Sequence, residues 1–143
     1  MDTCEIGRFG EDIAAAYLEA RGYEVVDRNV RACGGEVDLV ATVGAGGPAG
    51  GPAGGPAGGP AGDPAGGSAG DGPRDVVFVE VKYRSSDVMG VGAEAVTATK
   101  LRTVSRVGGA WLAAHPEIRP RAVRIDVIDI TGGEVTHYRD VTR

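Results

Sequence analysis

The octapeptide VVFVEVKY, residues 76–83, decides the fold. Valine and aromatic residues favour β-structure, and successive side chains of a strand point to opposite faces. The two faces carry Val77, Val79 and Val81 on one side, and Val76, Phe78, Glu80 and Lys82 on the other. Because both faces are largely apolar, the segment is predicted to be a central strand covered by other elements on both sides.

Two further strands are predicted before it, at residues 23–31 and 36–41. The first holds several valines among polar residues, and the turn-forming run 33–35 separates it from the second. By strand parity Val37 and Leu39 are expected to share one face. Three successive strands indicate an antiparallel meander.

Two amphipathic helices flank these strands in the sequence. Residues 6–21 carry Phe9, Ile13 and Tyr17 at four-residue spacing, and residues 97–114 repeat apolar side chains at three- and four-residue steps. The second helix is predicted to act as a crossover to a strand of the same sheet.

Residues 122–130 form that later strand, and residues 131–134 form a two-residue hairpin turn leading to an edge strand at 135–139. The order is helix, three strands, helix, two strands. This is an α/β fold with a mixed sheet flanked by helices, and residues 1–143 are predicted to form one domain.

Residues 44–73, between the second and third predicted strands, form an insertion that is almost entirely Gly, Ala and Pro. Such a composition buries little apolar surface, so the segment is predicted to be a disordered loop. The full chain has a net charge of −5, which argues against a strongly nucleic-acid-attracting surface. The two cysteines, Cys4 and Cys33, form no metal-type pair and are expected to be reduced thiols. With no signal peptide and no long apolar run, the protein is predicted to be cytoplasmic and to have no membrane partner.

Asp38, Glu80 and Lys82 carry the predicted chemistry. Glu80 and Lys82 lie two apart and project from the same strand face, where charges are costly unless they are paired or used. Without the insertion, Asp38 and Glu80 lie 12 residues apart, a spacing suited to a hairpin that brings them together. Two carboxylates suit Mg²⁺ or Mn²⁺, and Lys82 would position a water or offset charge during phosphodiester hydrolysis. The alternative is a surface ion pair between Glu80 and Lys82, which is common and weak.

Four segments together resemble the YraN-like family of bacterial proteins, which is similar to archaeal Holliday-junction resolvases and PD-(D/E)XK nucleases. They are GRFGE at 7–11, RNVR at 28–31, GEVDLV at 35–40 and VFVEVKYR at 77–84, with Lys100 and RIDV at 124–127 matching the later pattern. The resemblance implies a restriction-endonuclease-like fold. It also implies metal-binding roles for Asp38 and Glu80 and a catalytic role for Lys82.

The resemblance further implies that Glu11 completes the catalytic set, although a helix-dipole role for this glutamate is the alternative. Glu36 shares parity with Asp38 and is expected to raise the local negative potential rather than bind metal. Arg31, Arg84 and Lys100 are the expected nucleic-acid contacts, with ordinary solvent-facing roles as the alternative.

The sequence thus predicts a Mg²⁺- or Mn²⁺-dependent endonuclease acting on structured DNA. The competing hypothesis is a non-catalytic nucleic-acid-binding module or a partner in a repair or recombination assembly. Resolvase-like cleavage of two strands would require a homodimer.

Overall fold

The computed structural model describes residues 3–44, 74–84 and 98–141, and contains two helices and a five-stranded sheet within them. The elements, in chain order, are α1 Thr3–Ala20, β1 Tyr23–Ala32, β2 Gly35–Gly44, β4 Arg74–Arg84, α2 Ala98–Ala114, β5 Pro120–Thr131 and β6 Glu134–Tyr138. The predicted order of helix, three strands, helix and two strands is confirmed. The predicted disorder of residues 44–73 concerns a segment that, after Gly44, lies outside the described residues.

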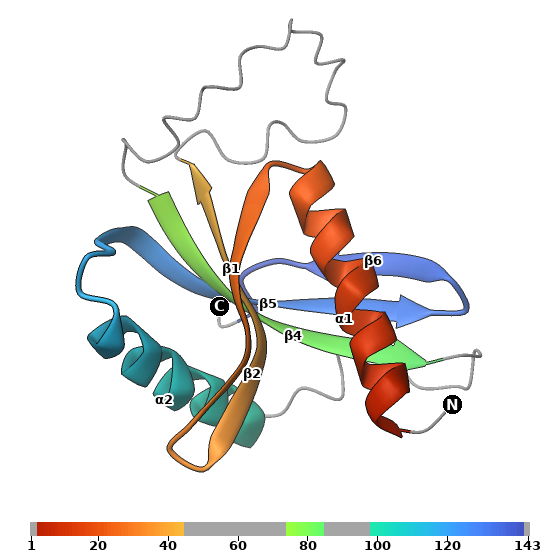
Figure 1. The fold of residues 1–143 in the computed structure, drawn as a ribbon, viewed down its shortest axis with the longest axis horizontal. Coiled ribbons are helices and arrows are strands. Elements are labelled where there is room, and N and C mark those ends of the chain that lie inside the picture. The colour runs from red at the N-terminus through yellow and green to blue at the C-terminus, as the bar shows by residue number, and fades with distance from the viewer. Residues whose placement is uncertain (1–2, 45–73, 85–97, 142–143) are drawn as a thin grey trace, which may run out of the picture.

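The sheet order is β1-β2-β4-β5-β6, so β4 is central as predicted. The first three strands pair antiparallel as a meander, β5 pairs parallel to β4, and β6 returns antiparallel to β5. The parallel pair confirms that α2 lies in a crossover connection (Figure 1). Gly132 and Gly133 both have positive φ angles of 60° and 89°, which is the backbone that a tight two-residue hairpin requires.

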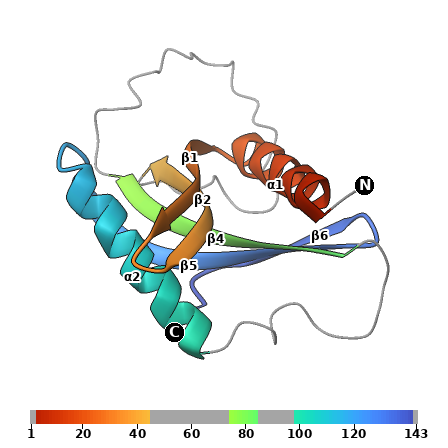
Figure 2. The same ribbon diagram turned by 60° about the horizontal axis from the view of Figure 1, so that its bottom comes forward.

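The two helices cover opposite faces of the sheet (Figure 2). Under α1, buried side chains from all but the edge strand β6 form one cluster: Ala14, Leu18, Tyr23, Leu39, Ala41, Val43, Val77, Val79, Ile128 and Ile130. Under α2 a second cluster contains Val37, Val40, Val76, Phe78, Val104, Val107, Trp111 and Ile125. The alternation of β4 between the two clusters agrees with the predicted two-faced central strand.

Gly108 explains how α2 packs so closely on β4. The sequence predicts only that a glycine here weakens the helix, at a cost of about 1 kcal/mol relative to alanine. A Cβ at this position would lie 2.7 Å from the Phe78 ring, so a larger residue would push the helix away from the sheet. The helix therefore gains close packing in exchange for lower intrinsic stability.

Neither helix in the described ranges is long and apolar enough to cross a membrane.

Candidate active site

Asp38 marks the point where β2 and β4 separate. Their antiparallel ladder ends at the pair Leu39 and Val79, and the Oδ2 atom of Asp38 then accepts a hydrogen bond of 2.8 Å from the backbone N–H of Val81. The carboxylate takes the place of the strand carbonyl that would otherwise continue the ladder. Asp38 is thereby held at the fork between the two strands, close to the backbone that carries Glu80.

The expectation that Val37 and Leu39 share a face is wrong. Val37 packs in the cluster under α2, whereas Leu39 packs in the cluster under α1. Regular alternation would place residues two apart on the same side, so β2 turns between these positions as it leaves β4. This turn is the same feature that makes the fork at Asp38.

Glu80 lies on the α2 side of β4, next to Phe78 along that face, with its side chain only 9% exposed. Its Oε2 atom is 3.1 Å from the Nζ of Lys100, in the first turn of α2, and 3.7 Å from the Nζ of Lys82. Lys82 thus lies where the sequence predicts it, beside the carboxylate of its own strand. Lys100 forms an ion pair with Glu80, and its contact with nucleic acid stays a prediction.

Asp129 is an acidic neighbour of this face that the sequence analysis missed. It pairs with Lys82 in the parallel β4–β5 ladder, is buried, and accepts a hydrogen bond of 2.5 Å from the hydroxyl of Thr131. Paired residues of adjacent parallel strands point to the same side of a sheet. Asp129 therefore adds a further carboxylate on the Lys82 side, which no sequence spacing could reveal because the β4–β5 register is a long-range feature.

The electrostatics of Asp38 set it apart from an ordinary surface aspartate. Burial raises the pKa of its carboxyl to about 7, and the negative charge of Glu80 contributes in the same direction. The hydrogen bond from Val81 opposes this shift, while the charges of Glu11 and Glu36 add to it. Four carboxylates from three elements therefore act on one another at the fork, and the region favours a bound cation or proton.

Glu11 reaches the fork from α1. Its Oε1 atom accepts a hydrogen bond of 3.2 Å from the side-chain amide of Asn29 on β1, and burial raises its pKa despite this bond. Helix α1 begins at Thr3, so Glu11 lies beyond the first turn. The helix-dipole explanation consequently does not account for a glutamate at this position.

Asn29 is a neighbour that the sequence analysis quoted only as part of a motif. Its φ angle is 51°, in the left-handed region that asparagine tolerates better than most residues. Position 29 therefore combines an unusual backbone with a side chain that orients Glu11.

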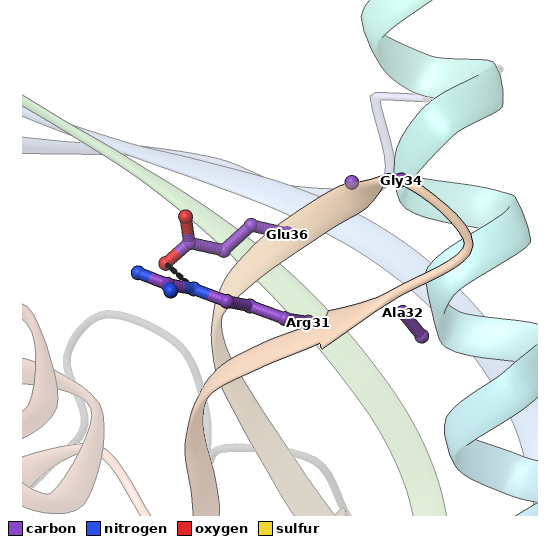
Figure 3. Close-up of a pocket in the computed structure, with 5 residues that line it drawn as sticks. Arg31, Ala32, Gly34 and Glu36 are labelled. Atoms are coloured by element: carbon purple, nitrogen blue, oxygen red, sulfur yellow. Dashed lines mark ion pairs between the residues drawn. The ribbon is translucent and has the colours of Figure 1, made fainter.

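The tip of the β1–β2 hairpin forms an open hollow of about 520 Å³ beside Glu36 (Figure 3). In this view Arg31 and Glu36 point to the same side of the hairpin, and the Nε of Arg31 is 3.8 Å from Oε2 of Glu36. Both side chains are substantially exposed, so this long ion pair contributes little to stability. Arg31 is accessible from solvent, and its use as a phosphate contact stays a prediction.

The three predicted nucleic-acid contacts do not form one cluster. Arg31 lies near the hairpin tip, Lys100 binds Glu80, and Arg84 ends β4, where its carbonyl accepts a hydrogen bond of 3.2 Å from Gly132. They lie on three different elements, β1, α2 and β4, and the β2 and β4 ribbons diverge in Figure 1.

The side chains at the fork include oxygen donors suited to a divalent metal, but they are not already arranged around one. Among residues 3–44, 74–84 and 98–141, no three Asp, Glu, His or Cys side chains are already arranged as a metal site. Asp38 and Glu80 supply hard oxygen donors, which Mg²⁺ and Mn²⁺ prefer. A cation bound to both would have to compete with Lys100 for Glu80.

A second polar cluster, built around one carboxylate, lies on the α1 face of the sheet. Asp126 on β5 is 0% exposed and accepts hydrogen bonds from Arg124 at 2.9 and 3.1 Å, and from the backbone N–H of Asp140 at 2.9 Å. Its Oδ2 atom also lies 2.7 Å from Nε2 of His137. Burial alone would raise the pKa of Asp126, but the bonds from His137, Arg124 and Asp140 outweigh it and hold the pKa below its usual value. The alternation of charged and apolar residues at 124–127 was the available sequence signal, although it carried no assigned role.

Comparison with known proteins assigns the chain to a family. The family model described as uncharacterised protein family UPF0102 matches residues 10–130. The chain belongs to the UPF0102 family.

Similar UPF0102 proteins cover nearly the whole chain. One from Mycolicibacterium vanbaalenii is 37% identical, over 96% of this chain and 93% of the relative. One from Beutenbergia cavernae is 38% identical, over 95% and 94%. The match confirms the predicted family, and it contains both Asp38 and the Glu80–Lys82 pair within residues 10–130.

Proposed function

We propose that this UPF0102 protein is a divalent-metal-dependent endonuclease of the restriction-endonuclease-like kind that acts on structured DNA in the cytoplasm. The observation that carries the proposal is the strand fork, where the Asp38 carboxylate is held against the Val81 backbone beside the buried Glu80. Two acidic groups concentrated beside two lysines match the needs of phosphodiester hydrolysis. A purely structural role leaves unexplained why several carboxylates act on one another here.

Asp38 and Glu80 would hold Mg²⁺ or Mn²⁺, which supplies charge neutralisation at a phosphate oxygen and a more acidic water. Lys82 lies within 3.7 Å of Glu80, so its ammonium is available to orient a water or offset negative charge near the same carboxylate. Glu11, oriented by Asn29, adds a further carboxylate from the α1 side. Lys100, whose Nζ lies 3.1 Å from Oε2 of Glu80, would add positive charge beside a phosphate bound at the fork.

A second candidate function is a non-catalytic DNA-binding module. The observation that favours it is the pairing of Glu80 with both Lys82 and Lys100, which neutralises the acid without any metal. In that case the site would be a stabilising ion cluster, and Arg31 and Arg84 would contact phosphates without cleavage following.

The test is cleavage of linear, flapped and four-way DNA by the purified full chain in Mg²⁺ or Mn²⁺. The D38N and K82M variants are expected to lose at least about a hundredfold in rate, since each removes a group that acts on the reacting phosphate. E117Q is the control, because Glu117 is exposed in the turn after α2, beyond the end of that helix opposite Lys100. It should retain wild-type activity.

Equal activity in D38N and the wild type would overturn the nuclease proposal. DNA binding without cleavage in any metal would favour the second function. Thermal unfolding with and without Mn²⁺ separates the two further. A bound metal should raise the Tm of the wild type but not of D38N, and a protein without a metal site should show no shift.

A further inference from the structure

The two helices carry opposite balances of charge. Helix α2 has three basic residues and no acidic residue. Helix α1 has four acidic residues and one basic residue: Glu5, Glu11, Asp12 and Glu19 against Arg8. The helices cover opposite faces of the sheet (Figure 2), so the two helical layers differ in charge although the whole chain carries −5. A negative net charge therefore does not exclude a local surface that attracts anions.

The three basic residues of α2 face in two directions. Lys100 lies one turn before the buried Val104, and its Nζ is 3.1 Å from Oε2 of Glu80. Arg102 and Arg106 are exposed and four residues apart, so they share one side of the helix, away from the sheet. Both arginines lie within two turns of Lys100. The outward-facing arginines therefore start at the end of α2 that reaches Glu80.

The charge of these two arginines is not balanced by the protein. Within residues 3–44, 74–84 and 98–141 neither forms an ion pair, and Arg102 makes one long hydrogen bond of 3.4 Å to the Thr99 hydroxyl. Five other arginines of the same ranges do pair with carboxylates: Arg28, Arg31, Arg74, Arg121 and Arg124. Like charges four residues apart destabilise a helix, and the helix dipole opposes cations near its N-terminus. Helix stability consequently does not explain the pair.

The spacing of the arginines and the residues beside them suit a sugar–phosphate backbone. Four helical residues rise about 6 Å, and each strand of a DNA duplex carries a phosphate about every 3.4 Å along its axis, so the pair can contact neighbouring phosphates. Ser105 and Gly109 are exposed on the same side of the helix. Arginines and hydroxyl groups are common phosphate contacts, and a glycine lets a backbone approach the helix closely.

We propose that the outer face of α2, formed by Arg102, Ser105, Arg106 and Gly109, is a docking surface for the backbone of duplex DNA. The inference rests on the proposed function in one respect, that the substrate is DNA. A duplex on this face adjoins the end of α2 at which Lys100 contacts Glu80. Phosphate contacts carry no base information, so the docking does not depend on sequence.

The test measures binding of a labelled blunt duplex by fluorescence anisotropy over a range of KCl concentrations. The full chain carries D38N, and no divalent metal is added, so that cleavage does not interfere. The R102Q/R106Q variant is expected to bind about tenfold more weakly at about 100 mM KCl. The slope of log K against log salt concentration should become shallower by about 1.8, or about 0.9 for each phosphate contact. Duplexes of unrelated sequence should lose equally.

The R21Q/R139Q variant is the matched control, because it removes the same charge from exposed arginines that follow α1 and β6. It should bind like the D38N parent. R102K/R106K keeps both charges on the outer face and should keep the salt slope. Thermal unfolding checks the fold, and R102Q/R106Q should have a Tm at least as high as the parent, since a repulsion is removed.

Equal affinity and slope for R102Q/R106Q and the matched control would overturn the docking surface. A loss confined to one DNA sequence would do the same, because backbone contact is independent of sequence. Displacement of the duplex by polyglutamate at equal charge concentration would assign the face to an acidic protein partner instead. Failure of the nuclease proposal appears separately, as cleavage that D38N does not reduce, and leaves the binding result unaffected.

Discussion

Asp38 and Asp126 are both aspartates on strands of the same sheet, yet their surroundings act on them in opposite directions. Asp126 is enclosed by Arg124, His137 and a backbone N–H, which hold its pKa below the ordinary value. Asp38 has one backbone donor and faces Glu80, and burial with this charge raises its pKa to about 7. The charge of one carboxylate is balanced by the protein itself, whereas the charge of the other is disfavoured by burial and by Glu80.

The contrast separates a carboxylate that stabilises the fold from one that is available for chemistry. Asp126 connects β5 to β6 and, through the 2.6 Å bond from Arg124 to the Tyr23 hydroxyl, to β1. Asp38 ends a ladder and contributes a single hydrogen bond to it. Mutations at the two positions should therefore change stability with opposite sign at neutral pH.

The largest expected effect is the loss of stability in D126A. Removing the carboxylate takes from the largely buried Arg124 its closest ionic partner and leaves it the Tyr23 hydroxyl and the 3.9 Å contact with Asp75, which should lower the free energy of unfolding by about 3–5 kcal/mol. Urea denaturation at neutral pH measures it. D126N, which keeps the size and one acceptor oxygen, is the control and should lose less. A loss below about 1 kcal/mol in D126A would contradict the stabilising role of Asp126, because a loss of that size is expected for an exposed ion pair.

The next effect is the pH dependence of stability at Asp38. Because its folded pKa of about 7 exceeds the ordinary value of 3.8, the folded protein keeps a proton that the unfolded chain releases between these values. The free energy of unfolding therefore falls as pH rises from about 4 to about 7, by roughly 2–4 kcal/mol for this one group. D38N cannot titrate and should be more stable than the wild type at pH 8 by that amount, with little difference at pH 4.

Urea denaturation of the wild type and D38N across this pH range gives the measurement. The side-chain oxygen of asparagine can still accept the bond from Val81, so the variant changes the charge with little change in geometry. Parallel stability profiles for the two proteins would show that Asp38 titrates normally.

The smallest effect is expected for R28A, which removes the 2.8 Å ion pair between Arg28 and Asp12. Both side chains are exposed, so the loss should be no more than about 1 kcal/mol and should shrink as salt is added. The salt dependence of R28A and of the wild type can be compared by thermal unfolding. A loss as large as that of D126A would mean that burial does not distinguish the two kinds of ion pair.

Much of the fold followed from local patterns. The alternation of residues 76–83 placed β4 at the centre with two covered faces, and the four-residue rows located both helices. The prediction that Val37 and Leu39 share a face was wrong. Alternation assumes a regular strand, whereas β2 turns where it leaves β4. The row through Phe9 likewise indicates an apolar face, but how far the sheet extends beneath it is not encoded in the helix itself.

Only part of the candidate site was predicted, because local patterns do not show how separate elements pack. Asp38, Glu80 and Lys82 were found from spacing and motif, and the antiparallel pairing of β2 and β4 places the first two near one another. The contact of Lys100 with Glu80, the orientation of Glu11 by Asn29 and the place of Asp129 beside Lys82 depend on how separate elements pack. No spacing along the chain contains that information.

The sequence by itself determined the order of the elements, the central strand and the residue types at the fork, because side-chain periodicity and hydrophobicity act over a few neighbouring residues. Only the tertiary structure decided which carboxylate is neutralised and which is not. A pKa depends on burial and on charges brought close in space. Asp38 and Asp126 look alike in the sequence and differ because different strands and side chains surround them.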